Sequence, residues 1–154
     1  MSREWMVEPI DVCDRRIAAR VLNIQRAAYE IEAGLIGFDG IPALAENLED
    51  LMESAYLLEW TGIRFEGSIV AAMATRTERG VCDIDRLVVD PAWFRRGLAR
   101  SLVSTLADRR TVTVSTGAAN LPGIELYESM GFQQESTETN PPGVTIAYLR
   151  RSAG

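Results

Sequence analysis

The sequence has 154 residues, of which 47% are hydrophobic and 25% are charged, and its formal net charge is −6. This length and composition predict a single soluble globular domain over residues 1–154, because the chain is too short for two domains of ordinary size. The negative charge argues against nonspecific nucleic-acid binding, which depends on neutralising phosphates.

The residue types present exclude several kinds of site. No histidine occurs, which excludes a His general base, a Ser-His or Cys-His nucleophile pair and His metal ligands. Cys13 and Cys82 are too few for a disulfide framework or a zinc site, so we expect both to be buried and expect no metal. No apolar run could span a bilayer, and residues 1–11 lack the apolar core of a signal peptide, so we expect a cytoplasmic protein without membrane contacts.

The first part of the chain is predicted to be a strand followed by two helices. Residues 5–12 read as a short strand, and residues 14–33 as a helix whose apolar residues recur at spacings of four and three. Such a pattern is typical of a surface helix laid on a sheet. After a glycine-rich turn, a second helix is expected to begin at Pro42. The predicted apolar stripe of the first helix contains Ile17, Val21, Ile24, Ala28, Ile31 and Leu35.

Three antiparallel strands are predicted next. A hairpin turn at 66–67 joins a strand over residues 56–65 to another over residues 68–76. A further turn at 79–80 leads into a third strand, residues 82–89, which lies in the centre of the predicted sheet.

The most informative stretch covers residues 83–106. An apolar strand is broken by an Asp-Pro pair, and an Arg-Arg-Gly loop then leads into an amphipathic helix. This arrangement points unpaired backbone N–H groups at one position, which suits a phosphate. Gly97 lets the backbone approach a ligand closely, and Arg95, Arg96 and Arg100 add positive charge. A solvated basic turn explains the arginines equally well, and neither the mononucleotide P-loop motif nor the Rossmann motif is present.

The last part of the chain completes an α/β fold. Residues 111–115 form a β-branched strand, parallel to the central one if a right-handed crossover joins them. Residues 120–132 read as a helix that a proline starts and a glycine ends, and Tyr127 on its apolar face is adequately explained as a core residue. Residues 132–139 and 143–150 are expected to form a closing antiparallel hairpin. The elements together predict a mixed sheet covered by helices.

Two of these stretches, residues 83–106 and residues 120–132, resemble the motifs of the GNAT superfamily of acyl-CoA N-acyltransferases. The second family motif, N-x-x-a-x-x-l-Y-e-x-x-G-F, matches residues 120–132. The resemblance extends from Tyr56 onward and implies the GNAT fold, a mixed, mostly antiparallel sheet of about seven strands with a splayed parallel pair, flanked by about four helices. The first family motif, V-x-P followed by [QR]-x-x-G-x-[GA], stands here as Val89-Asp90-Pro91 and Phe94-Arg95-Arg96-Gly97-Leu98-Ala99, with Phe94 in place of the usual Gln or Arg.

The resemblance implies acetyl-CoA as cosubstrate and a primary amine as acceptor, either a small molecule or a peptide N-terminus. The pantetheine arm is expected to enter between the splayed strands, and Tyr127 is expected to protonate the departing thiolate. A backbone N–H near Val89 is expected to stabilise the carbonyl oxygen as it becomes negative. The residues expected to bind the cosubstrate are Leu87, Val88, Val89, Arg95, Arg96, Gly97, Leu98, Ala99, Arg100, Asn120 and Tyr127.

The general base has more than one candidate. Asp83 and Asp85 follow the same alternation as Leu87 and Val89, which predicts that they share one face of the sheet. By register, Asp83 falls where the histone-acetylating branch of the family carries its glutamate base. Alternatively, Asp83 pairs with Arg86 or with a backbone amide, and a chain of waters serves as the base.

The acceptor site is predicted less specifically than the cosubstrate site. In the family, the helix-loop-helix between the first two strands covers the acceptor, which makes Tyr29, Glu30, Phe38 and Glu46 candidates for substrate binding, together with Asp85. Exposed strand edges are compatible with a homodimer. Two other functions stay open: a non-catalytic GNAT-fold module that binds acyl-CoA as a sensor or partner-binding domain, and a phosphate-binding regulatory α/β domain.

Overall fold

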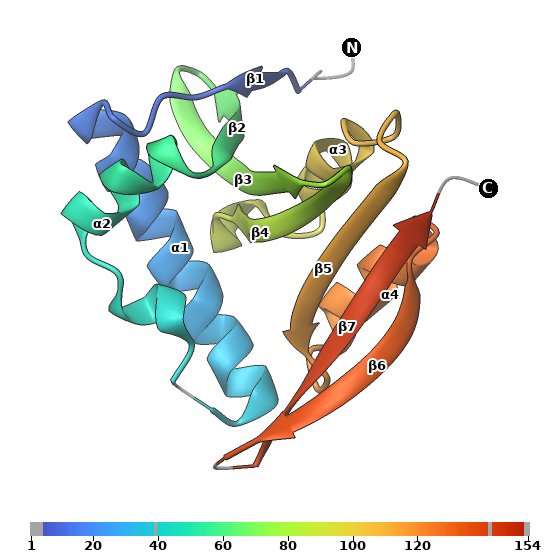
Figure 1. The fold of residues 1–154 in the computed structure, drawn as a ribbon. Coiled ribbons are helices and arrows are strands. Elements are labelled where there is room, and N and C mark those ends of the chain that lie inside the picture. The colour runs from blue at the N-terminus through green and yellow to red at the C-terminus, as the bar shows by residue number, and fades with distance from the viewer. Residues whose placement is uncertain (1–4, 39, 142, 153–154) are drawn as a thin grey trace.

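The structure is a computed structural model that describes residues 5–38, 40–141 and 143–152. Seven strands form one sheet in the order β1-β2-β3-β4-β5-β7-β6 (Figure 1). Neighbouring strands are antiparallel except for β4 and β5, which are parallel, so the predicted mixed sheet is confirmed. The strands are β1 (Val7–Pro9), β2 (Glu59–Phe65), β3 (Ser68–Glu78), β4 (Val81–Val89), β5 (Thr111–Gly117), β6 (Gln133–Asn140) and β7 (Val144–Ser152).

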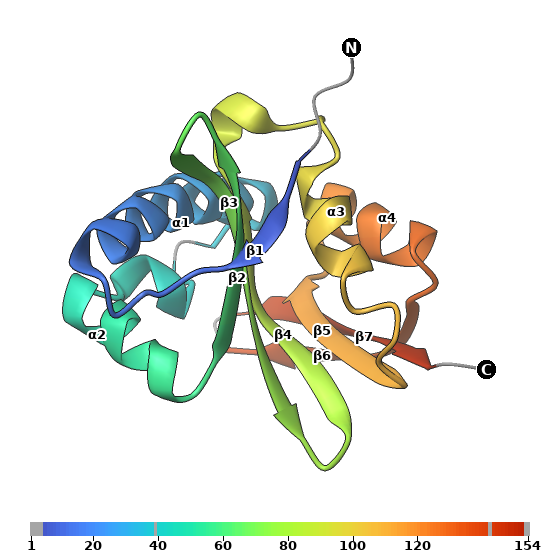
Figure 2. The same cartoon turned by 90° about the horizontal axis from the view of Figure 1, so that it is seen from above.

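Different helices cover the two faces of the sheet. Figure 2 shows α1 and α2 on one face and α3 and α4 on the other. The second helix, predicted to begin at Pro42, is divided into a 3-10 turn over its first residues and a short α-helix after them. The helices are α1 (Arg15–Ile36), α2 (Leu48–Glu53), α3 (Leu98–Ser104) and α4 (Leu121–Ser129), and the 3-10 turns are η1 (Pro42–Ala45), η2 (Ser54–Tyr56) and η3 (Pro91–Trp93). Among the residues described, no helix combines the length and apolarity that a membrane crossing requires.

Helix α1 follows the predicted apolar stripe only in its first half. The Asp14 carboxylate caps the first turn by accepting backbone N–H bonds, as expected for an aspartate before a helix. Ile24 is buried, at 1% exposure, but Ile31 and Leu35 are 43% and 47% exposed, so the prediction was wrong for the second half. The cause is a polar inner face of α1 that carries Gln25, Tyr29 and Glu32.

Separate apolar cores lie on the two faces of the sheet. Leu102 belongs to the core under α3 and α4, and Leu51 to the core under α1 and α2; both are fully buried. Cys82 is buried in the first core, as predicted. Cys13 is exposed, which corrects the prediction of two buried cysteines, because it lies in the turn before α1 and outside both cores.

A β-bulge in β4 determines which way its side chains face. Pairing with β3 skips one residue between Ile84 and Arg86, so Asp85 is the extra residue. Ile84 and Leu87, although three residues apart, therefore contact the same core. The predicted shared face of Asp83, Asp85 and Leu87 is wrong, because the bulge interrupts the alternation and places Asp83 on the opposite face from Leu87.

Candidate active site

The sheet opens between β4 and β5. Their parallel pairing covers only residues 81–84 and 111–114, after which β4 continues beside β3 alone and β5 beside β7 alone. The predicted splayed pair is therefore confirmed. Over residues 85–89, one backbone edge of β4 has no strand partner in the described chain. Such an edge can accept an extended ligand as if it were another strand.

The loop after β4 leaves a row of backbone N–H groups unused. The N–H of Phe94 donates to the carbonyl of Pro91 at 3.3 Å, and the next internal bond runs from the N–H of Ser101 to the carbonyl of Gly97 at 3.0 Å. Between these bonds, the N–H groups of residues 95–100 find no acceptor among the described residues. A cluster of adjacent free N–H groups is suited to an anion such as a diphosphate.

The conformation of this loop requires a glycine at one position. Gly97 has φ 80, and a Cβ added there would meet no atom within 4 Å, so backbone conformation rather than packing selects glycine. Arg95, with φ 63, adopts a left-handed conformation without that freedom. The turn is therefore held by its surroundings. The Asp90 carboxylate contributes, because it accepts from the N–H of Ala92 at 3.0 Å and from Arg20 of α1 at 2.7 Å.

The three predicted arginines have different environments. The guanidinium of Arg96 lies 4.8 Å from the ring centroid of Trp93, as a cation–π pair. Arg100 donates to the Ser129 hydroxyl at 2.6 Å and thereby links α3 to α4. Arg95 is exposed. The positive charge predicted for this loop is present, but part of it also holds the local structure together.

Asn120 and Tyr127 lie at one end of the opening, on α4. The Asn120 side chain caps α4 by accepting from the N–H of Gly123 at 3.3 Å, and its Nδ2 donates to the hydroxyl of Thr116 at 3.0 Å. Tyr127 is 7% exposed, and its ring packs 5.5 Å from that of Phe132, centroid to centroid. Burial raises the pKa of the Tyr127 hydroxyl, so the hydroxyl stays protonated at neutral pH.

Sequence reasoning missed one residue of this group, Glu32. Its Oε1 accepts a hydrogen bond of 3.2 Å from Nδ2 of Asn120, and burial raises the pKa of its carboxyl. Tyr29, one turn earlier on α1, also faces this region, and burial raises its pKa as well. Glu32 was missed because the apolar residues of α1 predicted a different inner face. The spacing of Gln25, Tyr29 and Glu32, four residues and then three, was the pattern that could have found it.

The other predicted residues of the acceptor site are more scattered. Asp83 accepts from the Thr113 hydroxyl at 2.7 Å, within the closed part of the β4–β5 pair. Glu30 is exposed on α1, away from the face that carries Glu32. The Phe38 ring is half-buried and lies over Gly40, where an added Cβ would come within 2.3 Å of it.

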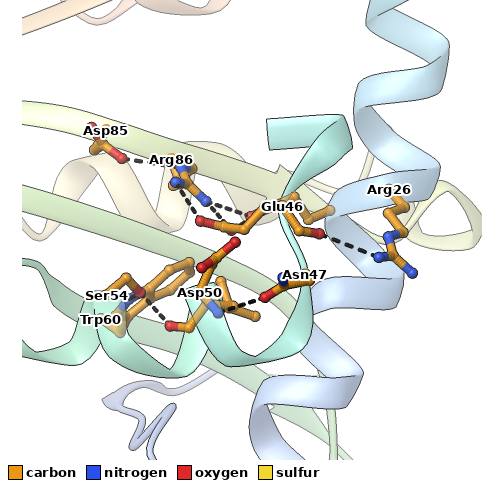
Figure 3. Close-up of polar contacts among 10 residues, drawn as sticks. Arg26, Glu46, Asn47, Asp50, Ser54, Trp60, Asp85 and Arg86 are labelled. Atoms are coloured by element: carbon orange, nitrogen blue, oxygen red, sulfur yellow. Dashed lines mark hydrogen bonds and ion pairs between the residues drawn. The ribbon is translucent and has the colours of Figure 1, made fainter. Parts of the chain in front are cut away.

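An ion-pair network joins β4 to the segment between α1 and α2. Arg86 donates from Nη1 and Nη2 to the two carboxylate oxygens of Glu46, at 2.7 and 3.1 Å (Figure 3). Gln25, fully buried, donates to Glu46 and accepts from Arg86, both at 3.0 Å. Burial alone would raise the pKa of Glu46, but the bonds from Arg86 and Gln25 lower it below its usual value. The Nε of Arg86 donates to Asp85 at 3.0 Å.

A cavity of about 600 Å³ lies beside this network, between α2, η2 and the strands β3 and β4. Its charged lining residues are Glu46, Asp50, Glu53, Asp85, Arg76 and Arg86. The acidic residues outnumber the basic ones, so the cavity suits a cationic ligand better than an anionic one. The described residues contain no group of carboxylates or cysteines arranged to hold a metal ion.

Comparison with known proteins finds a matching family model and a curated relative. A family model described as "Acetyltransferase (GNAT) domain" matches residues 56–134. UPF0157 protein YqkA of Bacillus subtilis (strain 168) is 32% identical over 148 residues, a match that covers 94% of this chain and 43% of that protein. The chain thus spans less than half the length of this relative.

Solved structures resemble the whole described fold. The ribosomal-protein-S18-alanine N-acetyltransferase of Escherichia coli superposes with a TM-score of 0.75 at 18% identity, covering 98% of this chain and 97% of that one. The PaiA N-acetyltransferase of Thermoplasma acidophilum, in complex with coenzyme A, has a TM-score of 0.78 at 10% identity, covering 98% and 100%. At such identities the likeness shows a shared fold.

Proposed function

Because the chain belongs to the GNAT acetyltransferase family, we propose that it is an N-acetyltransferase that transfers the acetyl group of acetyl-CoA to a primary amine by direct attack. The observation that carries this proposal is the position of the free N–H groups of residues 95–100, which adjoin an open strand edge. That combination would hold a diphosphate and an extended arm together.

The cosubstrate would be held mainly by main-chain groups. The N–H groups of residues 95–100 would bind the diphosphate, with charge from Arg95 and Arg96. The open edge of β4 at Leu87–Val89 would bind the pantetheine amides. A backbone N–H near Val89 would stabilise the negative charge that develops on the thioester oxygen.

Two proton transfers are needed, and Tyr127 suits one of them. The departing thiolate needs a proton, and the buried hydroxyl of Tyr127 stays protonated at neutral pH. The acceptor must lose a proton, because an alkylammonium with a pKa of about 10.4 is not a nucleophile. The acidic lining of the cavity beside Asp85 favours a cationic amine as acceptor.

The proposal is tested by release of the CoA thiol from acetyl-CoA in the presence of primary amines. A suitable panel contains an alkyl monoamine, an alkyl diamine, an aminoglycoside and short peptides with free α-amino groups. Amine-dependent thiol release with a mass gain of one acetyl group on the amine is expected. Calorimetry with CoA, and competition between CoA and ADP, gives the binding constants independently of turnover.

A non-catalytic role is the alternative proposal. The length of the relative YqkA favours this role, because this chain matches less than half of that protein. A binding module within a larger protein would give a partial match of this kind. A module of this kind would bind acetyl-CoA in calorimetry and release no thiol with any amine of the panel.

A further inference from the structure

We propose that Glu32 is the general base that takes the proton from the acceptor amine, an inference that rests on the proposed function. Glu32 lies on the inner face of α1. Its Oε1 accepts a hydrogen bond of 3.2 Å from Nδ2 of Asn120, the N-cap residue of α4. α1 and α4 cover opposite faces of the sheet (Figure 2). Asn120 and its partner Thr116 lie beyond the part of β5 that pairs with β4, so Glu32 meets Asn120 beside the opening between β4 and β5.

The position of the Glu32 carboxylate is fixed by its neighbour. Asn120 uses Oδ1 to accept from the N–H of Gly123, which leaves Nδ2 to donate to Glu32 and to Thr116. The amide thus cannot rotate without losing the cap of α4. A base must be held in place to act efficiently, and this contact holds it.

Glu32 and Tyr127 are near enough to influence each other. The charge of Glu32 is one of the interactions that raise the pKa of the Tyr127 hydroxyl, after burial and the effect of Tyr29. Arg86 and Asp85 also act on the neighbouring Tyr29. Among the described residues, the groups whose pKa values the charge of Glu32 raises are Tyr29 and Tyr127. Both have raised pKa values and stay neutral near pH 7, so neither neutralises the carboxylate.

Glu32 is free to accept a proton, unlike the other carboxylates nearby. Within the described part of the chain it forms no ion pair, and its bond with Asn120 leaves Oε2 available. Glu46 is paired with Arg86 through both oxygens, and Asp85 with the Nε of the same residue. Asp83 accepts from Thr113 in the closed part of the β4–β5 pair.

Four proton transfers accompany the transfer of the acetyl group. The Glu32 carboxylate takes one proton from the ammonium, and the neutral amine forms a bond to the thioester carbonyl carbon. The C–S bond breaks, and the sulfur takes the hydroxyl proton of Tyr127. The nitrogen loses its second proton to the Tyr127 phenolate, and Glu32 releases its proton to solvent. One amide, one CoA thiol and one solvent proton result.

The test compares pH profiles of kcat/KM for Glu32→Gln, Asp83→Asn and the wild type, with the best amine of the panel. Glu125→Gln, an exposed glutamate on α4, is the matched control. Glu32→Gln is expected to lower kcat by about 10²-fold or more, with CoA binding by calorimetry unchanged. It is also expected to abolish the acidic limb of the profile, which is the fall of kcat/KM toward low pH as the base becomes protonated. Asp83→Asn and Glu125→Gln are expected to keep the limb.

Stability separates a catalytic from a structural role. Because the pKa of Glu32 is raised in the folded state, its ionised form opposes folding above the unfolded pKa, and Glu32→Gln is expected to melt no lower than the wild type at pH 7. Retention of the acidic limb and of kcat in Glu32→Gln would overturn the inference, as would loss of the limb in Asp83→Asn alone. Absence of turnover by the wild type with every amine would overturn the proposed function itself.

Discussion

Asn120 joins two helices on opposite sides of the sheet by a hydrogen bond of 3.2 Å from its Nδ2 to Oε1 of Glu32. The same side chain caps α4. Capping of α4 requires only the side-chain oxygen of Asn120, so capping alone does not explain the bond from its nitrogen to Glu32 on α1. The two contacts together make Asn120 the point at which the proposed cosubstrate site and the proposed base are connected.

Substitution of Asn120 tests this connection. Asn120→Asp keeps a capping carboxylate but faces Glu32 with a second negative charge, which is expected to raise the pKa of Glu32 further. The acidic limb of the pH profile should therefore move to higher pH. The melting temperature should fall at pH 7 and recover in acid, where one carboxyl is protonated. Asn120→Ala removes the cap and is expected to cost about 1 kcal/mol at every pH. A pH profile unchanged in Asn120→Asp would contradict the prediction.

Tyr127 is expected to act on the leaving group and not on affinity. Tyr127→Phe should lower kcat by at least about tenfold while the dissociation constant of CoA, measured by calorimetry, stays within error of the wild type. The exposed Tyr148, which donates to Glu138 at 3.1 Å, gives a matched Tyr148→Phe control with full activity. Equal turnover in Tyr127→Phe and the control would remove Tyr127 from the mechanism.

Gly97 and Gly80 provide a matched pair for the anion-binding loop. Their φ angles are 80 and 81, and a Cβ at either would meet no atom within 4 Å. Gly97→Glu and Gly80→Glu should therefore lose similar stability, about 1–2 kcal/mol. Only Gly97→Glu should lose CoA binding, because its carboxylate enters the proposed diphosphate site. Similar CoA affinities in both variants would show that the diphosphate binds elsewhere.

The pair Arg86–Glu46 is expected to fix the covering segment over β4. Both side chains are largely buried, so Glu46→Leu leaves Arg86 with only Asp85 and Gln25 as partners and should destabilise by about 3 kcal/mol. The double variant Arg86→Met, Glu46→Leu should recover much of that loss. Urea unfolding of the four proteins in this cycle measures the coupling, and strictly additive losses would contradict it.

The same pair predicts a pH dependence of stability. Because the folded-state pKa of Glu46 is lowered, its contribution is complete above the unfolded value of 4.5 and is lost as pH falls through the folded value. Thermal melts of the wild type and Glu46→Gln between neutral and strongly acidic pH should therefore converge in acid. A difference that persists at the acidic end would mean that Glu46 stabilises by packing and not by charge.

Much of the fold follows from local sequence patterns. Turn residues and alternating apolar residues predicted every strand after Tyr56, and the Asp-Pro pair with Gly97 predicted the loop between β4 and α3. These features are local, because they depend on backbone conformations that a few residues determine. The positions of Asn120 and Tyr127 followed from the motif that carries them.

The polar side of the site depends on distant contacts. Glu32 and Tyr29 lie on a face that hydropathy assigns to solvent, since Ile31 and Leu35 next to them are more apolar. Only partners on α4 and β4 make the polar face the buried one. The face of Asp83 was also beyond prediction, because an insertion of one residue in a strand leaves no mark on composition.

The extra residue at Asp85 has a consequence for how this chain can change in length. A hairpin tip such as that at 66–67 can gain or lose residues with effects confined to the surface, but deletion of Asp85 would restore even pairing with β3. Ile84 and Arg86 already pair with the adjacent residues Thr75 and Ala74, so the side chains beyond the deletion would keep their present faces and Arg86 would still point toward Glu46. The middle of this strand can therefore lose one residue at the cost of the Asp85 carboxylate beside Arg86, while the Arg86–Glu46 pair stays in place.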